Sequence, residues 1–461
     1  MFLRRNAGSI MKKRILTITG LLILAGIIAG VLRLDILLRV ATGYHAKILC
    51  SSVFISGRKS DDVKANELNF SLIKFVSCKV DTVRKSVTSY LLWRSSTAVY
   101  RQGYGTMLLP GGGDAQDRRK PFPRLPGPGY DPDTVPWPQG NRLPDNLQAG
   151  ASDKLQSIAD RLVEGHEFGG NPYAFIVLHR GVPVVERYKA GFTPATRFPA
   201  WSMAKSVTCS LAGLLVADGL LDTGSTTGIG AWKNDERRRI TVKDLLQMQS
   251  GLEWNEDYGN LSDVTRMLFT SDDFARYTEN KPPAHPAGTH WYYTSGTTNL
   301  LTSLMRRSFP SDSAYLAFPY LRLFYPLGVT QAVFETDPAG SFAGSSYLFA
   351  TARDFARFGL LWLNDGVFDG KRILPEGWVR FATTPASHSG KKYGACFWLN
   401  GGGRYPSAPA DMYFCIGVDG QRIFMVPSKD LVVVVLGYSH EPENKLNFDR
   451  LLGSLLPCFP G

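Results

Sequence analysis

Cysteine and histidine are scarce in this sequence, and their scarcity excludes several kinds of protein. Six cysteines are spread over 461 residues, and neither they nor the seven histidines show the close spacing of a metal site. We therefore expect no metal and no cofactor. Six cysteines are also too few for a disulfide scaffold, although an exported chain permits a bridge or two. The nearest pairs are Cys50 with Cys78 and Cys396 with Cys415, and buried free thiols are an equal alternative.

Two further patterns are missing. No long basic run is interleaved with aromatic residues, which argues against nucleic-acid binding, although the formal net charge is +12. No G-x-S-x-G strand elbow is present, which excludes an α/β-hydrolase built on that motif. What the chain does have is 44% hydrophobic residues, 46 glycines and 28 prolines, a composition typical of a loop-rich globular protein.

One long apolar run lies near the N-terminus. Residues 15–32 carry no charge, and as a helix they would span about 27 Å. Basic residues crowd the N-terminal side of this run, so residues 1–34 are predicted to be a cytoplasmic tail and a transmembrane signal anchor. The rest of the chain would then lie on the periplasmic side of the cytoplasmic membrane, held by a single pass. A cleaved signal peptide is the alternative, but no small-x-small cleavage site follows closely.

Three segments follow the predicted anchor. Residues 35–109 mix short apolar runs with single charges, and the sequence assigns them no role. Residues 110–146 are dense in proline and glycine, which indicates either an extended linker or a strap lying on the next domain. Residues 147–461 have the alternation of apolar and polar residues that is typical of a folded domain.

This last domain begins and ends with strand patterns. Residues 173–192 predict two strands with a tight turn at Arg180-Gly181, and residues 421–439 repeat that pattern with a turn at 427–430. Helical patterns lie between them, at residues 202–218, 242–248, 295–307 and 352–363. We therefore predict an α+β fold in which both ends of the domain build one antiparallel sheet, with a helical region inserted between them.

A serine and a lysine open one of these predicted helices. Ser202 and Lys205 are separated by two residues, a spacing that also occurs at Ser9/Lys12, Ser56/Lys59, Ser71/Lys74 and Ser389/Lys392. Only Ser202 begins a long helix of small and apolar residues. There the lysine lies one turn along on the same face, and apolar neighbours would lower its pKa. A neutral amine can then act as a base toward the hydroxyl, whereas a lysine that reaches solvent from a core helix is the alternative.

Two later segments carry residues that suit this chemistry. Tyr293 and Ser295 stand at a turn that feeds another predicted helix, and a phenol near the serine-lysine pair could relay a proton to a leaving group. A packed aromatic is the alternative interpretation of Tyr293. Gly417-Val418-Asp419-Gly420 stand at the head of the last predicted hairpin, where a free backbone N–H could complete an oxyanion hole.

The motifs Ser202-x-x-Lys205, Tyr293-Thr294-Ser295 and Gly417-Val418-Asp419-Gly420, in this order, resemble those of the serine β-lactamase-related hydrolases. Residues 240–254 and 345–379 are similar to connecting segments of that family, and the resemblance covers roughly residues 150 to 455. The family includes class C β-lactamases, penicillin-binding proteins, related esterases and 6-aminohexanoate-dimer hydrolases. The resemblance implies a β-lactamase/transpeptidase-like fold, with an antiparallel sheet flanked by helices, an all-helical region, and the site between them.

The resemblance also implies roles for individual residues. Ser202 would be the nucleophile that forms an acyl-enzyme, and Lys205 and Tyr293 would transfer protons. The backbone N–H groups of Ser202 and Val418 would form the oxyanion hole. Further candidates for substrate contact are Ser295, Gly417, Asp419, Gly420 and His440, with an ordinary surface histidine as the alternative for His440.

Two departures from the family pattern bear on the substrate. Ser295 stands where the family often has asparagine, and Gly417 and its neighbours supply no cation to hold a substrate carboxylate. The pattern is therefore closer to the 6-aminohexanoate-dimer hydrolase and esterase branch, and it predicts a membrane-anchored serine hydrolase acting on a small amide or ester, with residues 147–461 as the serine hydrolase domain. The alternatives are β-lactamase or D-alanyl-D-alanine carboxypeptidase activity, and a non-catalytic binding or sensor module on the same fold.

Overall fold

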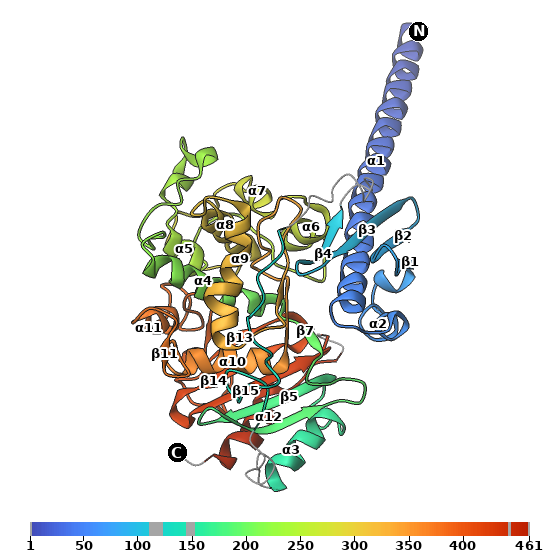
Figure 1. The fold of residues 1–461 in the computed structure, drawn as a ribbon. Helices are drawn as coiled ribbons and strands as arrows, with labels where there is room; N and C mark the ends of the chain where they lie inside the picture. The colour runs from blue at the N-terminus through green and yellow to red at the C-terminus, as the bar shows by residue number, and fades with distance from the viewer. Residues whose placement is uncertain (1, 110–122, 144–152, 441–443, 460–461) are drawn as a thin grey trace.

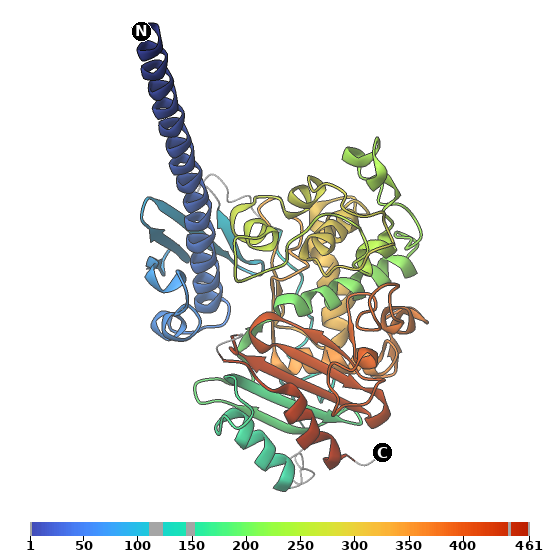
Figure 2. The same cartoon turned by 180° about the vertical axis from the view of Figure 1, so that it is seen from behind.

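The computed structural model describes residues 2–109, 123–143, 153–440 and 444–459, with side chains from residue 14 onward. Its longest element is helix α1 (Phe2–Phe54), which at 1.5 Å per residue is about 80 Å long. Figures 1 and 2 show the N-terminal part of α1 projecting away from the rest of the molecule. Residues 14–34 are all exposed, and buried side chains begin at Leu38. This helix is long and apolar enough to cross a membrane, and a signal sequence meets the same criterion.

The packed part of α1 carries a small antiparallel sheet, and together they form the N-terminal unit (residues 35–109). The sheet has the order β1-β2-β3-β4 and contacts α1 through apolar side chains such as Leu49, Val87 and Ala98. The elements of this unit after α1 are α2 (Ser60–Asn66), β1 (Ser77–Asp81), β2 (Ser86–Leu91), β3 (Arg94–Arg101) and β4 (Gly105–Leu109). The segment to which the sequence assigns no role is therefore folded, and its core continues into the next domain at Met267 and Phe274.

A buried ion pair joins the N-terminal unit to the C-terminal domain, which is described from residue 153 onward. Lys47 Nζ on α1 lies 2.6 Å from Glu335 Oε2, and these two side chains are 2% and 0% exposed. The same amine donates to the backbone oxygen and the hydroxyl of Thr106, at 2.6 and 2.8 Å. Burial lowers the pKa of Lys47, and the charge of Glu335 opposes that shift. Because a buried charge without a partner is costly, the pair fixes α1 against the C-terminal domain.

A six-stranded antiparallel sheet forms the base of the C-terminal domain, in the order β12-β13-β14-β15-β5-β6. Its strands are β5 (Pro172–His179), β6 (Val182–Tyr188), β12 (Trp398–Leu399), β13 (Tyr413–Ile416), β14 (Arg422–Val426) and β15 (Leu431–Gly437). Strand β15, near the end of the chain, pairs with β5, near the start of the domain, so that Val433 lies opposite Val177. The predicted sheet, built from both ends of the domain, is confirmed, and the turns at Arg180-Gly181 and 427–430 are present.

Helices cover both faces of this sheet. Val432 and Val434 of β15 point into the core that contains α4 (Ala204–Ala217) and α10 (Ala352–Leu363). Val433 and Val435 point into a second core, formed with α3 (Asp153–Val163) and α12 (Phe448–Leu455). Because both faces are covered, β15 is apolar at every position instead of alternating with polar residues.

The helical region lies between the first and last strands of the domain in sequence, and beside the sheet in space (Figure 1). It contains α4, α5 (Val242–Leu246), α6 (Asp263–Thr270), α7 (Phe274–Glu279), α8 (Ser295–Arg306) and α9 (Asp312–Pro319). Smaller elements are the sheet of β7 (Arg197–Pro199), β8 (Val333–Phe334) and β9 (Leu348–Thr351), the hairpin of β10 (Val367–Phe368) and β11 (Lys371–Arg372), and α11 (Trp378–Thr383). Each of the four predicted helices is present, although α4 begins at Ala204, two residues after Ser202.

The described part of the predicted linker or strap, residues 123–143, contains no helix or strand and lies against the C-terminal domain. The Arg357 side chain donates to the backbone oxygens of Pro138 and Gly140, and Trp137 Nε1 donates to the oxygen of Gly181 at 2.8 Å. These contacts are those of a strap. Residues 110–122 and 144–146 of the same segment lie outside the described residues.

The six cysteines all lie among the described residues, and all of them are free thiols there. The candidate bridges Cys50–Cys78 and Cys396–Cys415 are therefore not formed, and the alternative of free thiols holds. Cys50, Cys396 and Cys415 are buried, whereas Cys78 is half-buried.

Candidate active site

Ser202 lies at the N-terminal end of α4, in one turn of 3₁₀ helix over Trp201–Met203. The preceding Trp201 is buried and has a φ of 47°, a left-handed conformation that is unfavourable for a bulky residue. The turn presents Ser202 to a large cavity, although only 8% of the residue is exposed. Strained backbone of this kind is common beside reactive groups, and here it sets the position of one hydroxyl.

Lys205 lies one turn after Ser202, and its amine is surrounded by oxygen atoms. Lys205 Nζ is 3.0 Å from Ser202 Oγ, 3.0 Å from Ser295 Oγ and 3.1 Å from the backbone oxygen of Ser345. The residue is 1% exposed, and burial lowers its pKa from 10.5 to about 8. Near neutral pH a useful fraction of this lysine is therefore a neutral amine, able to take a proton from Ser202.

Tyr293 comes from a distant segment and completes the predicted cluster. Lys205 Nζ lies 4.8 Å from the centre of the Tyr293 ring, and the phenol also interacts with Ser202. Burial raises the pKa of Tyr293 well above 10, so the phenol is protonated at neutral pH. Its ring is held by Trp398 and Tyr393, whose ring centres lie 5.2 and 5.7 Å away. The structure thus brings Ser202, Lys205 and Tyr293 together, with Lys205 suited as base and Tyr293 as proton donor.

Glu256 also belongs to this cluster, and the sequence did not identify it. Its carboxylate accepts hydrogen bonds from the backbone N–H and the hydroxyl of Ser295, and from Trp254 Nε1. Burial raises the pKa of Glu256, and Lys205 and these hydrogen bonds oppose the shift. Glu256 belongs to no recognisable sequence motif, because it is a single glutamate in a loop between helices.

Ser295 lies between Glu256 and Lys205 and not at the cavity wall. It is 0% exposed, at the start of α8, which Thr294 caps by accepting a hydrogen bond from the N–H of Thr297. Its hydroxyl donates to Glu256 and accepts from Lys205 Nζ. In the structure the Ser295 hydroxyl thus contacts the lysine amine, and the substrate contact of Ser295 stays a prediction.

The segment 417–420 lies directly against the turn that carries Ser202. A Cβ atom at Gly417 would lie 2.3 Å from the backbone oxygen of Ala200, so only glycine permits this approach. Asp419 and Gly420 follow with φ of 60° and 88°, which bends the chain before β14. Gly417, Val418 and Gly420 line the same cavity as Ser202, so the segment borders the space in front of the serine.

His440 and Asp419 form a pair on the wall of the cavity. His440 Nδ1 lies 2.9 Å from Asp419 Oδ1, and the histidine ring packs against Phe70 with ring centres 4.7 Å apart. Burial raises the pKa of Asp419, and His440 opposes that shift. Both residues line the cavity that Ser202 faces, so the structure brings His440 to the site from the far end of the last hairpin.

The cavity in front of Ser202 has a volume of about 900 Å³ and lies between the two folded units. The C-terminal domain supplies one wall, which includes Tyr258 and Trp398. Helix α1 and the segment 70–73 supply the other wall. The residues from these two segments are Arg33, Leu37, Val40, Ala41, Tyr44, Phe70, Ser71, Leu72 and Ile73. No motif in the sequence indicated that residues 33–73 take part in the site.

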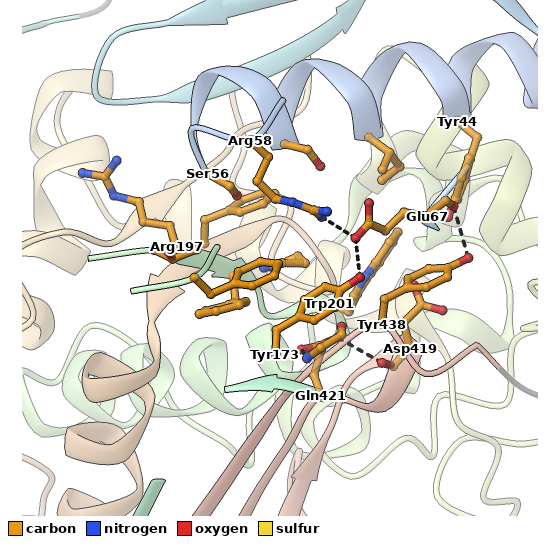
Figure 3. A pocket seen from close by; sticks show the side chains of 18 residues that line it. Tyr44, Ser56, Arg58, Glu67, Tyr173, Arg197, Trp201, Asp419, Gln421 and Tyr438 are labelled. Carbon is orange, nitrogen blue, oxygen red and sulfur yellow. Dashed lines mark hydrogen bonds and ion pairs between the residues drawn. The ribbon is translucent and has the colours of Figure 1, made fainter. Parts of the chain in front are cut away.

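A second, smaller cavity of about 50 Å³ lies behind Trp201 (Figure 3). Figure 3 shows Arg58 of the N-terminal unit pointing toward Glu67, and the Glu67 carboxylate pointing toward Tyr173 of the C-terminal domain. The Tyr173 hydroxyl donates to Glu67 Oε1 at 3.0 Å, and the Tyr438 hydroxyl donates to the Glu67 backbone oxygen at 3.1 Å. Arg58 pairs with the same carboxylate. These contacts hold the wall of the main cavity in place from behind.

Comparisons with known proteins bear on the family and the fold of this chain. The beta-lactamase family model matches residues 156–453. The 6-aminohexanoate-dimer hydrolase of Paenarthrobacter ureafaciens is 25% identical over 301 residues, covering 59% of this chain and 74% of that protein.

Two solved structures share the fold. A candidate 6-aminohexanoate-dimer hydrolase from Bacillus anthracis superposes with a TM-score of 0.57 at 21% identity, covering 74% of this chain and 93% of that chain. EstA from Arthrobacter nitroguajacolicus Rue61a superposes with a TM-score of 0.51 at 17% identity, covering 66% and 96%. Because the family match spans more than half of the chain, this protein belongs to the beta-lactamase family and has its serine-hydrolase-type fold.

Proposed function

We propose that this protein is a membrane-anchored serine hydrolase that cleaves an amide or ester bond through an acyl-enzyme on Ser202. The observation that carries the proposal is the distance of 3.0 Å between Ser202 Oγ and a buried Lys205 amine whose pKa is lowered to about 8. A lysine held this way is a base that works near neutral pH, and the adjoining cavity has room for a substrate.

Acylation begins when Ser202 Oγ attacks the substrate carbonyl carbon and its proton passes to the neutral amine of Lys205. The negative charge moves to the carbonyl oxygen, where the backbone N–H groups of Ser202 and Val418 stabilise it. When the bond to the leaving group breaks, Tyr293 gives its proton to the departing nitrogen or oxygen. Lys205 returns a proton to Tyr293, which leaves both groups as they began.

Deacylation repeats these steps with water as the nucleophile. The water oxygen attacks the acyl carbon, and one of its protons passes to Lys205. Ser202 Oγ then leaves as the new acid forms, and it recovers its proton from Lys205. In both halves Ser295 and Glu256 act as positioning residues, because Ser295 accepts from the lysine amine and Glu256 holds Ser295.

A small linear amide or ester fits this site better than a β-lactam. The third motif supplies no cation beside Ser202, since Gly417 and Val418 stand at these positions. Arg422 lines the cavity, but its Nη1 donates to the backbone oxygens of Gly417 and Gln421, which holds the bend of the chain. The name of the Paenarthrobacter relative points to a linear amide as the substrate of that protein.

We also propose that α1 is an uncleaved anchor. Residues 14–34 are all exposed, and the uncharged stretch within them, residues 15–32, is stable in a bilayer and not in water. The helix then continues without a break into the packed part that lines the cavity. The C-terminal domain would lie on the periplasmic side, as the basic residues before the apolar run indicate.

The direct test is labelling with a fluorophosphonate probe, followed by identification of the modified residue. The probe is expected to label the native chain at Ser202, and Ser202→Ala is expected to abolish labelling. Ser389→Ala is the matched control, because Ser389 has the same spacing to a lysine and is 3% exposed but lies outside the cavity. Labelling that persists in Ser202→Ala, or that is lost only in Ser389→Ala, would contradict the proposal.

A further inference from the structure

We propose that the active-site cavity opens at the membrane surface, and that the protein acts on amphiphilic amides or esters whose acyl chain enters from the bilayer. The proposal rests on the proposed function at Ser202 and on α1 as an uncleaved anchor, and it adds the substrate class. Three observations support it: the point where the apolar run of α1 ends, a hairpin tip at the same level, and a stripe of α1 that runs into the site.

The first observation fixes the level of the membrane. The uncharged run ends at residue 32, and Arg33 follows it. The continuously exposed part of α1 ends at Leu34, contact with the rest of the molecule begins at Asp35, and the first buried side chain is Leu38. A cation directly after an apolar run is typical of the boundary between hydrocarbon and headgroups. The folded part of the molecule therefore begins within about one helical turn of the membrane surface.

The second observation is the tip of the β2–β3 hairpin. Leu92 and Trp93 form this tip and are 72% and 55% exposed. Trp93 Nε1 donates to Asp35 Oδ1 at 2.8 Å, and the Arg94 guanidinium pairs with the same carboxylate. These bonds hold the hairpin tip beside α1 only two residues beyond Arg33. An exposed leucine and tryptophan at this level suit the interfacial layer of a bilayer.

The third observation connects that level to the site. Arg33, Leu37, Val40, Ala41 and Tyr44 all line the cavity that Ser202 faces. Their spacing of four, three, one and three residues places them on one face of α1, so they form a single stripe about 16 Å long. We call these five residues the α1 stripe. It begins at the membrane boundary and ends beside the active site.

The side chains of the α1 stripe and of the neighbouring cavity wall indicate which kind of substrate could pass along the stripe. Leu37, Val40 and Ala41 are apolar, and Phe70 and Leu72 face the same cavity. An acyl chain that leaves the bilayer along this surface stays out of water, while its amide or ester group reaches Ser202. Arg33 stands at the membrane end, where it suits an anionic headgroup. The N-terminal unit would thus select substrates by their apolar chain.

The experiment uses the full-length chain in phosphatidylcholine vesicles and compares two esters. p-Nitrophenyl laurate partitions into the bilayer, whereas p-nitrophenyl acetate reaches the site from water. Leu37→Asp places a charge on the α1 stripe, and the ratio of laurate to acetate hydrolysis is expected to fall at least tenfold. Leu34→Asp is the matched control: Leu34 and Leu37 are both 37% exposed, but Leu34 does not line the cavity. For Leu34→Asp the ratio is expected to stay within twofold of native.

The outcomes separate the two proposals. If the native chain hydrolyses neither ester and a fluorophosphonate does not label Ser202, the proposed function fails. If both reactions occur but the ratio is the same for Leu37→Asp and Leu34→Asp, the membrane route alone is overturned. A second measurement tests the level of the hairpin tip: brominated lipids are expected to quench the tryptophan fluorescence of the native chain more than that of Trp93→Phe. Equal quenching would contradict the placement of Trp93 at the bilayer surface.

Discussion

At the scale of single residues, the proposed chemistry depends on the burial of one amine, that of Lys205, away from water. Lys205 was identifiable because it follows a serine at the right spacing in a helix of small residues. The groups that set its properties were not identifiable. Ser295 and Glu256 reach it only after the chain has folded, and their hydrogen bonds place a half-buried carboxylate close to the amine.

At this scale we predict how the hydrolysis rate depends on pH. Lys205 must be neutral to accept a proton, and its pKa is lowered by burial to about 8. The kcat/KM for p-nitrophenyl acetate is therefore expected to rise about tenfold per pH unit below pH 8 and to level off above it. The nearby charge of Glu256 raises the pKa of Lys205, so Glu256→Gln is expected to move the rise to lower pH.

Glu253→Gln is the matched control for this pH profile, because Glu253 lies three residues earlier and is exposed. Its profile is expected to coincide with that of the native chain. A profile of Glu256→Gln that matches the native one would show that the carboxylate does not act on the amine. A midpoint near 10 in the native chain would refute the lowered pKa of Lys205.

At the scale of secondary-structure elements, the decisive contact is between the turn that carries Ser202 and the chain that follows β13. The sequence indicated glycines there, and the structure shows why one of them is needed. Gly417 has an ordinary extended conformation, so its requirement is for space and not for an unusual φ. The backbone of Ala200 occupies the volume that any side chain would need.

Gly417→Ala is therefore expected to lower kcat/KM by about 100-fold, the usual cost of displacing one oxyanion donor. The added methyl would push Val418 away from Ser202, and fluorophosphonate labelling would slow in parallel. Gly230→Ala is the control, because nothing lies within 4 Å of a Cβ at that position and its φ is ordinary. A Gly417→Ala variant with native kinetics would show that this segment has no part in the oxyanion hole.

At the scale of the whole molecule, two folded units share one cavity. The C-terminal domain carries the proposed chemistry, and the N-terminal unit closes one side of the site. The two units are joined by the buried pair Lys47–Glu335 and by the contacts of Glu67 with Tyr173 and Tyr438. The position of α1 relative to Ser202 therefore depends on these polar contacts together with the apolar core that both units share.

The prediction at this scale concerns stability. Glu335→Gln leaves the Lys47 cation buried without its partner, so the free energy of unfolding is expected to fall by about 3–5 kcal/mol. The double variant Lys47→Met with Glu335→Leu removes both charges and is expected to recover most of that loss. Thermal unfolding of the purified chain in detergent measures both effects.

The control is an exposed ion pair. Arg239 and Glu236 are 67% and 66% exposed, so Glu236→Gln is expected to change stability by less than about 0.5 kcal/mol. Equal and small effects of Glu335→Gln and Glu236→Gln would mean that the buried pair does not hold the two units together.

The sequence alone determined the features that depend on neighbours along the chain. It predicted the long apolar helix, the hairpins at both ends of the domain, the four helices and the serine-lysine pair, because periodicity and short spacings determine local structure. Its motif order also indicated the family, and the comparison with known proteins established it.

Only the tertiary structure decided which distant segments meet. Glu256 behind Lys205, Gly417 against Ala200, and the α1 stripe in front of Ser202 depend on packing between residues far apart in sequence. No local pattern encodes such contacts, because they arise from the mutual burial of whole surfaces. The role of residues 35–109 was for this reason invisible in the sequence and became clear from the cavity wall that they build.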